Sequence, residues 1–212
     1  MSRTAATRLP EMMSANRADL DALLDRTVLG HFAFTGEDGR PVSLPSVIAR
    51  WGDQILTHGS TGSRWLRRIA AGVPVAVSVA TVDGVVVARS AYASSLLYAS
   101  AVLFGAFTPL AGEDKLAALD VLTDRLLPGR TAEVRRPTAK ELAATTMLAM
   151  PIGEWSVRLS DGWPEDPEPD VAGPAWAGLI RFGVPPATLA GAPDLRPGIP
   201  VAPSAGQVRG IR

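Results

Sequence analysis

The sequence contains no cysteine and only two histidines, His31 and His58, among its 212 residues. Without cysteine the chain has no disulfide framework, no thiolate nucleophile and no zinc site with thiolate ligands. A zinc site would depend on carboxylates, and no HExxH spacing occurs. We therefore expect no dedicated metal-ion site.

An excess of either charge is also absent, because 21 Lys and Arg residues balance 21 Asp and Glu residues. This balance argues against a basic nucleic-acid-binding protein and against an acidic solvating tail. The first ten residues contain no apolar run of the kind found in secretory signals. We expect a cytoplasmic protein of one domain, or at most two small ones, that binds neither nucleic acid nor a membrane.

One long stretch, residues 90–112, carries no charge and is long enough to span a bilayer. Its apolar positions are mostly alanine, and it includes several serines and Pro109. A spanning helix usually contains more leucine, isoleucine and valine. We favour a pair of buried strands over a membrane span.

Hydrophobic periodicity and turn residues divide the chain into strands with a few helices. Helices are predicted over 14–26, 63–72 and 113–126, with a short one after the capping box of Thr138 and Glu141. Strands are predicted over 28–35, 41–50, 53–58, 73–81, 85–92, 98–107 and 147–159, with hairpin turns at 36–39, 51–53 and 83–84. The pattern predicts a mainly β, antiparallel barrel or sandwich with peripheral helices.

The composition changes after Asp161, since ten of the 18 prolines lie in residues 161–212. We expect a barrel domain over 1–160 and a proline-rich extension over 161–212. Such an irregular segment is expected to pack on the barrel or on a partner subunit.

The densest polar cluster is Thr57-His-Gly-Ser-Thr-Gly-Ser-Arg-Trp65, between a predicted strand and a predicted helix. Hydroxyls, glycines and an arginine beside a helix start suit an anion such as phosphate. The spacing is neither that of a Walker loop nor that of a nucleophile elbow. The alternative is a Ser- and Gly-rich turn followed by a capped helix.

Other polar and aromatic residues have structural explanations of their own. His58 suits a ligand, a base or a hydrogen-bonded residue at a strand end, and His31 lies in an apolar run that favours a core position. The charged residues of 124–136 are explained by a solvated, salt-bridged face. Three tryptophans pack a core or stack on a flat ligand: Trp155, Trp163 and Trp176.

The order of several segments resembles the pyridoxamine 5'-phosphate oxidase-like split-barrel flavoproteins, in their flavin-nucleotide-binding and nitroimidazole-resistance-like branch. The segments are Val28-Leu-Gly-His-Phe-Ala, Asp38-Gly-Arg-Pro-Val, Pro45-Ser-Val-Ile-Ala-Arg50, Leu56-Thr-His-Gly-Ser-Thr-Gly-Ser-Arg64, Asp83-Gly-Val-Val-Val-Ala-Arg-Ser90, Leu127-Pro-Gly-Arg130, Glu141-Leu-Ala-Ala-Thr145, Asp161-Gly-Trp-Pro164 and Trp176-Ala-Gly178. Each is weak alone, but their common order over about residues 8–182 is specific.

The resemblance implies a six-stranded antiparallel split barrel that forms a homodimer and binds FMN in a groove between subunits. The cofactor-binding residues that it implies are Ser46 and Val47 beside the ring, Thr57 and His58 along the ribityl chain and ring, Arg50, Ser63 and Arg64 at the phosphate, and Ser100 on a central strand. Ser60 joins them from the same polar cluster, and His58 is also the candidate catalytic donor. Trp65 stands where related oxidases often have a second basic residue.

One segment departs from the family pattern, which has an acidic residue followed by Ser-Met-His/Asn-Tyr-Arg-Ser. Here the acidic position is Ala93, the His/Asn position is Leu97 and the Arg position is Ala99. Either the protein binds flavin in a more apolar pocket, shaped by the region of Leu96 and Leu97, or it has lost the family's usual activity.

The resemblance leads to two hypotheses of different classes. The first is an FMN-dependent oxidoreductase that acts on a small organic molecule. The second is a non-catalytic or altered-ligand protein that binds haem or deazaflavin on the same dimeric barrel. The visible spectrum of the purified protein distinguishes a flavin from a haem.

Overall fold

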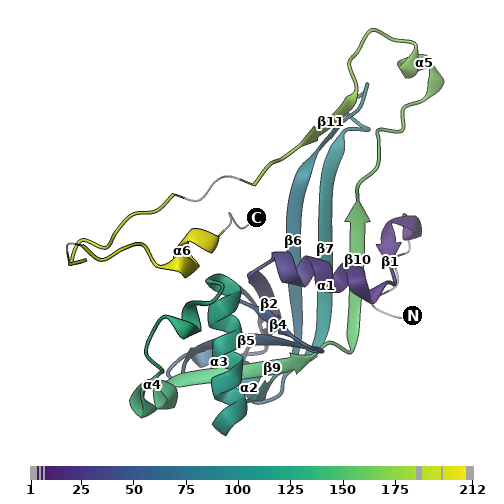
Figure 1. Ribbon diagram of the computed structural model, residues 1–212. Helices are drawn as coiled ribbons and strands as arrows, with labels where there is room; N and C mark the ends of the chain where they lie inside the picture. The colour runs from purple at the N-terminus through teal and green to yellow at the C-terminus, as the bar shows by residue number, and fades with distance from the viewer. Residues whose placement is uncertain (1–3, 5, 7, 185–187, 197, 209–212) are drawn as a thin grey trace.

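The computed structural model describes residues 4, 6, 8–184, 188–196 and 198–208. Two antiparallel sheets form the body, with helices around them (Figure 1). The strands are β1 Met13–Ser14, β2 Leu29–Thr35, β3 Pro41–Val47, β4 Ala49–Trp51, β5 Gln54–Ser60, β6 Pro74–Val87, β7 Ser95–Ala106, β8 Thr108–Pro109, β9 Thr145–Pro151, β10 Glu154–Ser160 and β11 Gly178–Arg181. The helices are η1 Pro10–Met12, α1 Arg17–Arg26, α2 Arg64–Ala70, α3 Gly112–Leu126, η2 Arg130–Ala132, α4 Ala139–Ala144, α5 Glu168–Val171 and α6 Pro203–Gln207.

The larger sheet has seven strands in the order β1-β10-β7-β6-β2-β3, with β11 paired to β6. The smaller sheet has four strands in the order β4-β5-β9-β8. The sequence prediction of a mainly β, antiparallel split barrel with peripheral helices is confirmed.

Two hydrophobic clusters hold these layers together. The main core lies between the two sheets, where α1 contributes Leu20, Leu23 and Leu24, and α2 contributes Leu66 and Ile69. A second cluster lies on the other face of the smaller sheet, where Ala118 and Leu122 of α3 pack on Leu56 and Met147. Because both faces of the smaller sheet are covered, three successive residues of β5 are buried, and the strand shows no polar alternation.

Among the described residues, the other face of the larger sheet has no comparable cover. In β2 the burial alternates residue by residue, and the exposed set includes His31 and Ala33. Strand register continues this set across the sheet in two rows: His31, Ser78, Val102 and Ser156 in one row, and Ala33, Ala76 and Phe104 in the next. We call this surface the open sheet face. The prediction that His31 lies in the core is wrong, since it lies on this face.

The strands β6 and β7 form a hairpin that extends far beyond the body, and α5 and β11 lie at its outer end (Figure 1). The predicted turn at Asp83-Gly84 is wrong, because β6 continues through these residues with a register shift between Val82 and Gly84. Glycine is required there by close packing: an added Cβ would lie 2.3 Å from the carbonyl oxygen of Ile180 on β11. The hairpin turns at residues 88–94 instead.

Two predicted strands are each divided between the two sheets. Residues 41–50 form β3 in the larger sheet and β4 in the smaller one, and the chain changes sheet at Ile48. Residues 147–159 likewise form β9 and β10, separated by Ile152 and Gly153. The two changes of sheet produce the split barrel.

Helix boundaries follow the predicted signals closely. Asn16 caps α1 by accepting a hydrogen bond from the Ala18 amide, and Thr138 and Glu141 form the predicted capping box of α4. Ser63 is the N-cap residue of α2, but its side chain makes no cap hydrogen bond.

The uncharged stretch 90–112 forms the hairpin turn, β7 and β8. No helix in the described part of the chain is long and apolar enough to cross a membrane.

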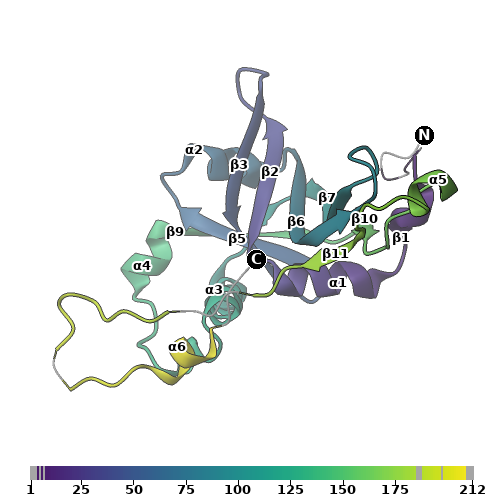
Figure 2. The same cartoon turned by 90° about the horizontal axis from the view of Figure 1, so that it is seen from above.

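Contacts at both ends attach the described part of the extension after Asp161 to the rest of the chain, among them an ion pair between Asp166 and Arg89 in the hairpin turn. At one end, β11 pairs with β6, and Arg181 forms an ion pair with Asp161 at 2.7 Å. At the other end, the backbone amide and hydroxyl of Ser204 in α6 donate to Glu133 at 2.8 and 2.5 Å. Figure 2 shows the intervening chain leaving the sheets and returning beside α3.

Candidate functional site

The polar cluster predicted from the sequence occupies the end of β5 and the turn into α2. His58 and Ser60 lie on β5, and Ser63 and Arg64 follow within four residues. The turn is closed by its own hydrogen bonds, from the Ser63 amide to the Ser60 carbonyl and from the Gly62 amide to the Ser60 hydroxyl. Arg64 is exposed and makes no hydrogen bond or ion pair with another described residue.

A second group of predicted residues meets beside β5. The Thr57 hydroxyl donates to the Val47 carbonyl oxygen at 2.9 Å and lies 3.5 Å from the hydroxyl of Ser46. Thr57 is completely buried on the main-core side of the sheet. Its hydroxyl is therefore satisfied inside the protein.

Arg50 lies away from this cluster. It pairs with Ile55 across β4 and β5, whereas Ser60 is at the other end of β5, about 17 Å further along at about 3.4 Å per residue. Its guanidinium forms a bidentate ion pair with Asp25 on α1, at 2.9 and 2.6 Å. The structure therefore does not bring Arg50 and Arg64 together at one phosphate within a protomer.

Ser100 is also separate from the β5 cluster in this chain. It lies in the middle of β7, paired with Ala80 and Arg158, on the open sheet face. Contact with a ligand held at β5 would require a second subunit.

His58 opens into a cavity of about 520 Å³ between β5, α3 and α4. The cavity is lined by aliphatic side chains, threonines and four charged groups: Leu119, Asp120, Thr123, Thr131, Val134, Arg135, Arg136, Pro137, Glu141, Leu142 and Thr145. Its volume is within the range of cofactor sites. The lining residues come from distant parts of the sequence.

The imidazole of His58 has an unsatisfied nitrogen. Its Nδ1 atom is buried and has no hydrogen-bond partner among the described residues. Burial lowers the pKa of His58 from its ordinary value of 6.5, because desolvation disfavours the charged ring. The side chain is therefore neutral at pH 7 and can offer a nitrogen lone pair to a ligand.

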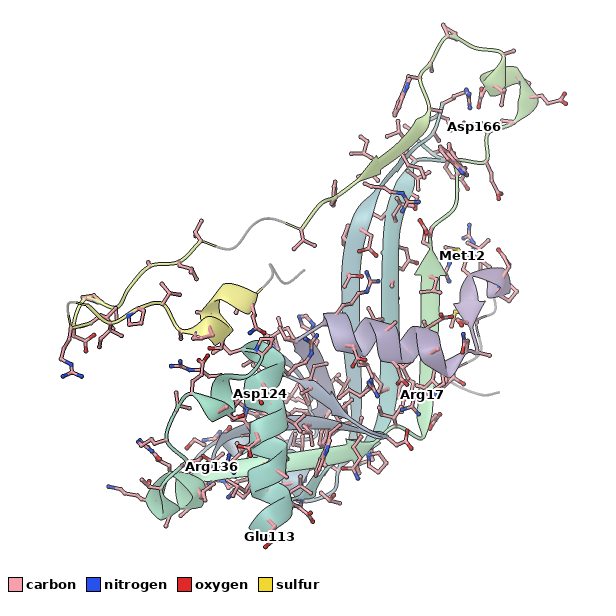
Figure 3. The ribbon with its side chains drawn as sticks, viewed as in Figure 1. Met12, Arg17, Glu113, Asp124, Arg136 and Asp166 are labelled. Atoms are coloured by element: carbon pink, nitrogen blue, oxygen red, sulfur yellow. The ribbon has the colours of Figure 1, made fainter. Side chains whose placement is uncertain are left out.

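Two arginines at the cavity rim are held by carboxylates. Arg135 donates to both oxygens of Glu141 at 2.8 and 2.7 Å, and Arg136 donates to both oxygens of Asp120 at 2.7 Å. Figure 3 shows Arg136 beside α3, toward α4. The arginine and the amide of Thr138 lower the pKa of Glu141 to about 2.

Sequence reasoning missed these rim residues, because the charges of 124–136 were interpreted as a solvated face. The available signal was the adjacent pair Arg135 and Arg136 immediately before Pro137. Sequence spacing alone does not show that this pair reaches the cavity of His58.

The three positions that depart from the family pattern do not face this cavity. Leu97 is fully buried, and Ala99 is 3% exposed in the main core. Ala93 lies in the hairpin turn. Apolar residues at Leu97 and Ala99 are therefore explained by packing within the protomer.

The tryptophans divide by location. Trp155 packs against the main core, as does Trp65, whose ring lies 5.5 Å from that of Phe32. Trp163 and Trp176 are 73% and 67% exposed at the outer end of the hairpin. Of the two roles open to these tryptophans, a core position is excluded for Trp163 and Trp176, as expected for residues of the proline-rich extension.

Comparison with solved structures places two proteins close to this chain along nearly its whole length. The FAD- and haem-binding protein from Mycobacterium smegmatis is 48% identical, with a TM-score of 0.90 over 94% of this chain and 98% of that chain. The flavocytochrome Anf3 from Azotobacter vinelandii is 30% identical, with a TM-score of 0.88 over 96% and 95%. No curated protein matches the chain.

A more distant protein shares the fold alone. It is assigned to 5-nitroimidazole antibiotic resistance in Bacteroides thetaiotaomicron and is 12% identical, with a TM-score of 0.59 over 68% of this chain and 84% of that chain. The family model described as pyridoxamine 5'-phosphate oxidase matches residues 16–159, more than half of the sequence. The chain therefore belongs to the pyridoxamine 5'-phosphate oxidase family.

Proposed function

We propose that the protein is a homodimeric redox protein that binds a flavin and a haem, with the haem in the cavity of His58. The observation that carries this proposal is the buried, unpartnered Nδ1 of a neutral histidine in a cavity of about 520 Å³. Neutral imidazole is a common axial ligand of haem iron. The relatives with 48% and 30% identity are a FAD- and haem-binding protein and a flavocytochrome, which supports the same pair of cofactors.

The choice of His58 rather than His31 as the proposed haem ligand follows from the surroundings of the two side chains. His31 is exposed on the open sheet face and lines none of the cavities described above. His58 is half-buried, and its cavity has the aliphatic walls of Leu119, Val134 and Leu142. Apolar walls limit the access of water to a bound ring.

The flavin is proposed to bind with its phosphate groups near Ser60, Ser63 and Arg64. Arg64 has no internal ion-pair partner, so its charge is available to a phosphate. The sequence predicted FMN, and the relative that is 48% identical is named for FAD. We propose FAD here, and chromatography of the released flavin distinguishes the two forms.

A second subunit is part of the proposal because the open sheet face lacks a cover. Its rows combine serine and alanine with Val102 and Phe104, and they offer a partly apolar surface on which another copy can pack. Ser100 lies on this face and would then contact a flavin held at the β5 end of the partner.

When bound, a flavin and a haem would supply the capacity for electron transfer. The chain's own residues would hold and insulate them: His58 supplies a neutral nitrogen, Arg64 neutralises phosphate, and the walls of the cavity exclude water. The proposed activity is electron transfer to or from a small organic molecule.

Absorption spectra of the purified protein, after addition of FAD and hemin, test the proposal. Flavin bands and a Soret band that both persist through gel filtration are the expected result. Arg64→Ala should weaken FAD binding by about 2 kcal/mol, or roughly thirtyfold, because a charge-assisted contact is lost. Arg67→Ala, an exposed neighbour on the same helix, serves as the control. Absence of both chromophores after this treatment would overturn the proposal.

A further inference from the structure

The rim of the cavity has more hydrogen-bonding capacity than its internal ion pairs use. Arg136 contacts both oxygens of Asp120 through a single terminal nitrogen, Nη1. A guanidinium has five N–H donors, so the Nε and Nη2 groups of Arg136 remain without a partner among the described residues. Arg135 donates through Nη1 and Nη2, while its Nε group has no described partner.

Fold stability alone gives little reason for this arrangement. The side chains of Arg135 and Arg136 are 68% and 53% exposed, and exposed ion pairs contribute about 0–1 kcal/mol. Their ion pairs nevertheless hold both guanidinium groups at the mouth of one cavity, Arg135 through two nitrogens and Arg136 through one. Fixed donors at a cavity mouth lower the entropic cost of binding an anion there.

We propose that Arg135 and Arg136 bind the two carboxylate groups of a planar dianionic ligand whose ring lies toward His58. This inference rests on the proposed function, in which the ligand is haem and the carboxylates are its propionates. Each guanidinium then shares its donors between the internal carboxylate and a propionate. The arginines thus set the orientation of the ring and select for ligands with two acidic groups.

The carboxylates at the rim determine whether a substitution there raises or lowers the affinity for the dianionic ligand. Asp120 and Glu141 neutralise the two arginines, so these four groups together carry no net charge. Both carboxylates compete with an anionic ligand for the same N–H donors. Asp120→Asn should therefore tighten binding of the dianionic ligand, whereas Arg136→Gln should weaken it.

Titration with hemin and with hemin dimethyl ester, followed at the Soret band, tests the proposal. The ester keeps the ring and the iron but removes both negative charges. We expect the parent protein to bind hemin at least about tenfold more tightly than the ester, since about 1.4 kcal/mol corresponds to tenfold. The double variant Arg135→Gln/Arg136→Gln should lose this preference and retain its affinity for the ester.

Lys140→Gln is the matched control, because it removes a positive charge from α4 without changing the cavity lining. Equal affinity of the parent for hemin and its ester would overturn the rim proposal, and so would an unchanged preference in the double variant. The comparison of the two ligands on the parent protein does not depend on how well a variant folds. A parent that binds neither hemin nor its ester would instead overturn the proposed function.

Discussion

At the scale of single residues, two of the three departures from the family pattern, Leu97 and Ala99, are packing positions. Ala99 is 3% exposed on the main-core side of β7, between the core and a cavity lined by Asp83 and Leu159, so an arginine there would have little room. The family pattern has an arginine at this position. The structure instead indicates that such a change damages the core.

We predict that Ala99→Arg lowers the free energy of unfolding by about 2 kcal/mol, because the long side chain overpacks a position that is 3% exposed. Denaturation in urea measures the change. Ala117→Arg, the same substitution at an exposed position of α3, should alter stability by less than about 0.5 kcal/mol. Similar stability of the two variants would contradict the assignment of Ala99 to the core.

His58 also makes a residue-scale prediction about pH. Burial lowers the pKa of His58, so between that lowered value and 6.5 the unfolded chain binds a proton that the folded chain does not. His58 therefore makes the free energy of unfolding fall as the pH drops from about 7 toward 5. In His58→Gln this fall should be smaller, whereas between pH 7 and 9 the two curves should run parallel. Parallel curves over the whole range would contradict burial of the neutral ring.

At the scale of elements, the outer end of the β6–β7 hairpin is fixed by one buried ion pair. The carboxylate of Asp166 is fully buried; it accepts hydrogen bonds from the Arg89 amide at 3.0 Å and from the Arg89 guanidinium at 3.0 Å. This contact joins the hairpin turn to the segment that carries Trp163 (Figure 3). The exposed aromatic side chains at this end are thereby attached to an ordered loop.

Asp166→Ala should release this segment, because it leaves the Arg89 charge and amide without their partner. We expect local opening to become easier by about 3 kcal/mol, or roughly a hundredfold faster proteolysis within residues 161–177. Limited proteolysis with mass spectrometry measures the cleavage sites. The exposed neighbour Glu165→Ala should leave the rate unchanged. Equal rates of proteolysis in the two variants would contradict the role of Asp166 in fixing this segment.

The elements that sequence analysis predicted well are those whose signals are local. The capping box of Thr138 and Glu141 and the cap at Asn16 are read from neighbouring residues. Changes of sheet at Ile48 and Ile152 are harder to predict from sequence, since apolar residues precede both positions without a break in the pattern. Gly84 was read as a turn because the close approach of β11 comes from a segment almost 100 residues later.

The candidate site was predictable to a similar extent. The cluster from His58 to Arg64 is contiguous and was recognised from its residue types. The rim formed by Arg135 and Arg136 was missed, because the cavity depends on the placement of α3 and α4 against β5. His31 was misplaced because small apolar residues occur on both faces of β2.

At the scale of the whole molecule, the open sheet face predicts a dimer. We expect the parent protein to sediment as a dimer at micromolar concentration. Ala76→Arg, on the open face, should weaken dimerisation by about tenfold or more, because it places a charge within a packed sheet interface. Ala22→Arg on the exposed side of α1 should not. A parent protein that sediments as a monomer would contradict the proposed dimer.

The central claim is that His58 holds the haem iron, and imidazole rescue tests it most directly. His58→Gly should bind hemin with a Soret band that differs from that of the parent, because the iron lacks its protein nitrogen ligand. Added imidazole, which fits the space left by the missing ring, should restore the parent spectrum. A variant that shows the parent spectrum without imidazole would contradict the account.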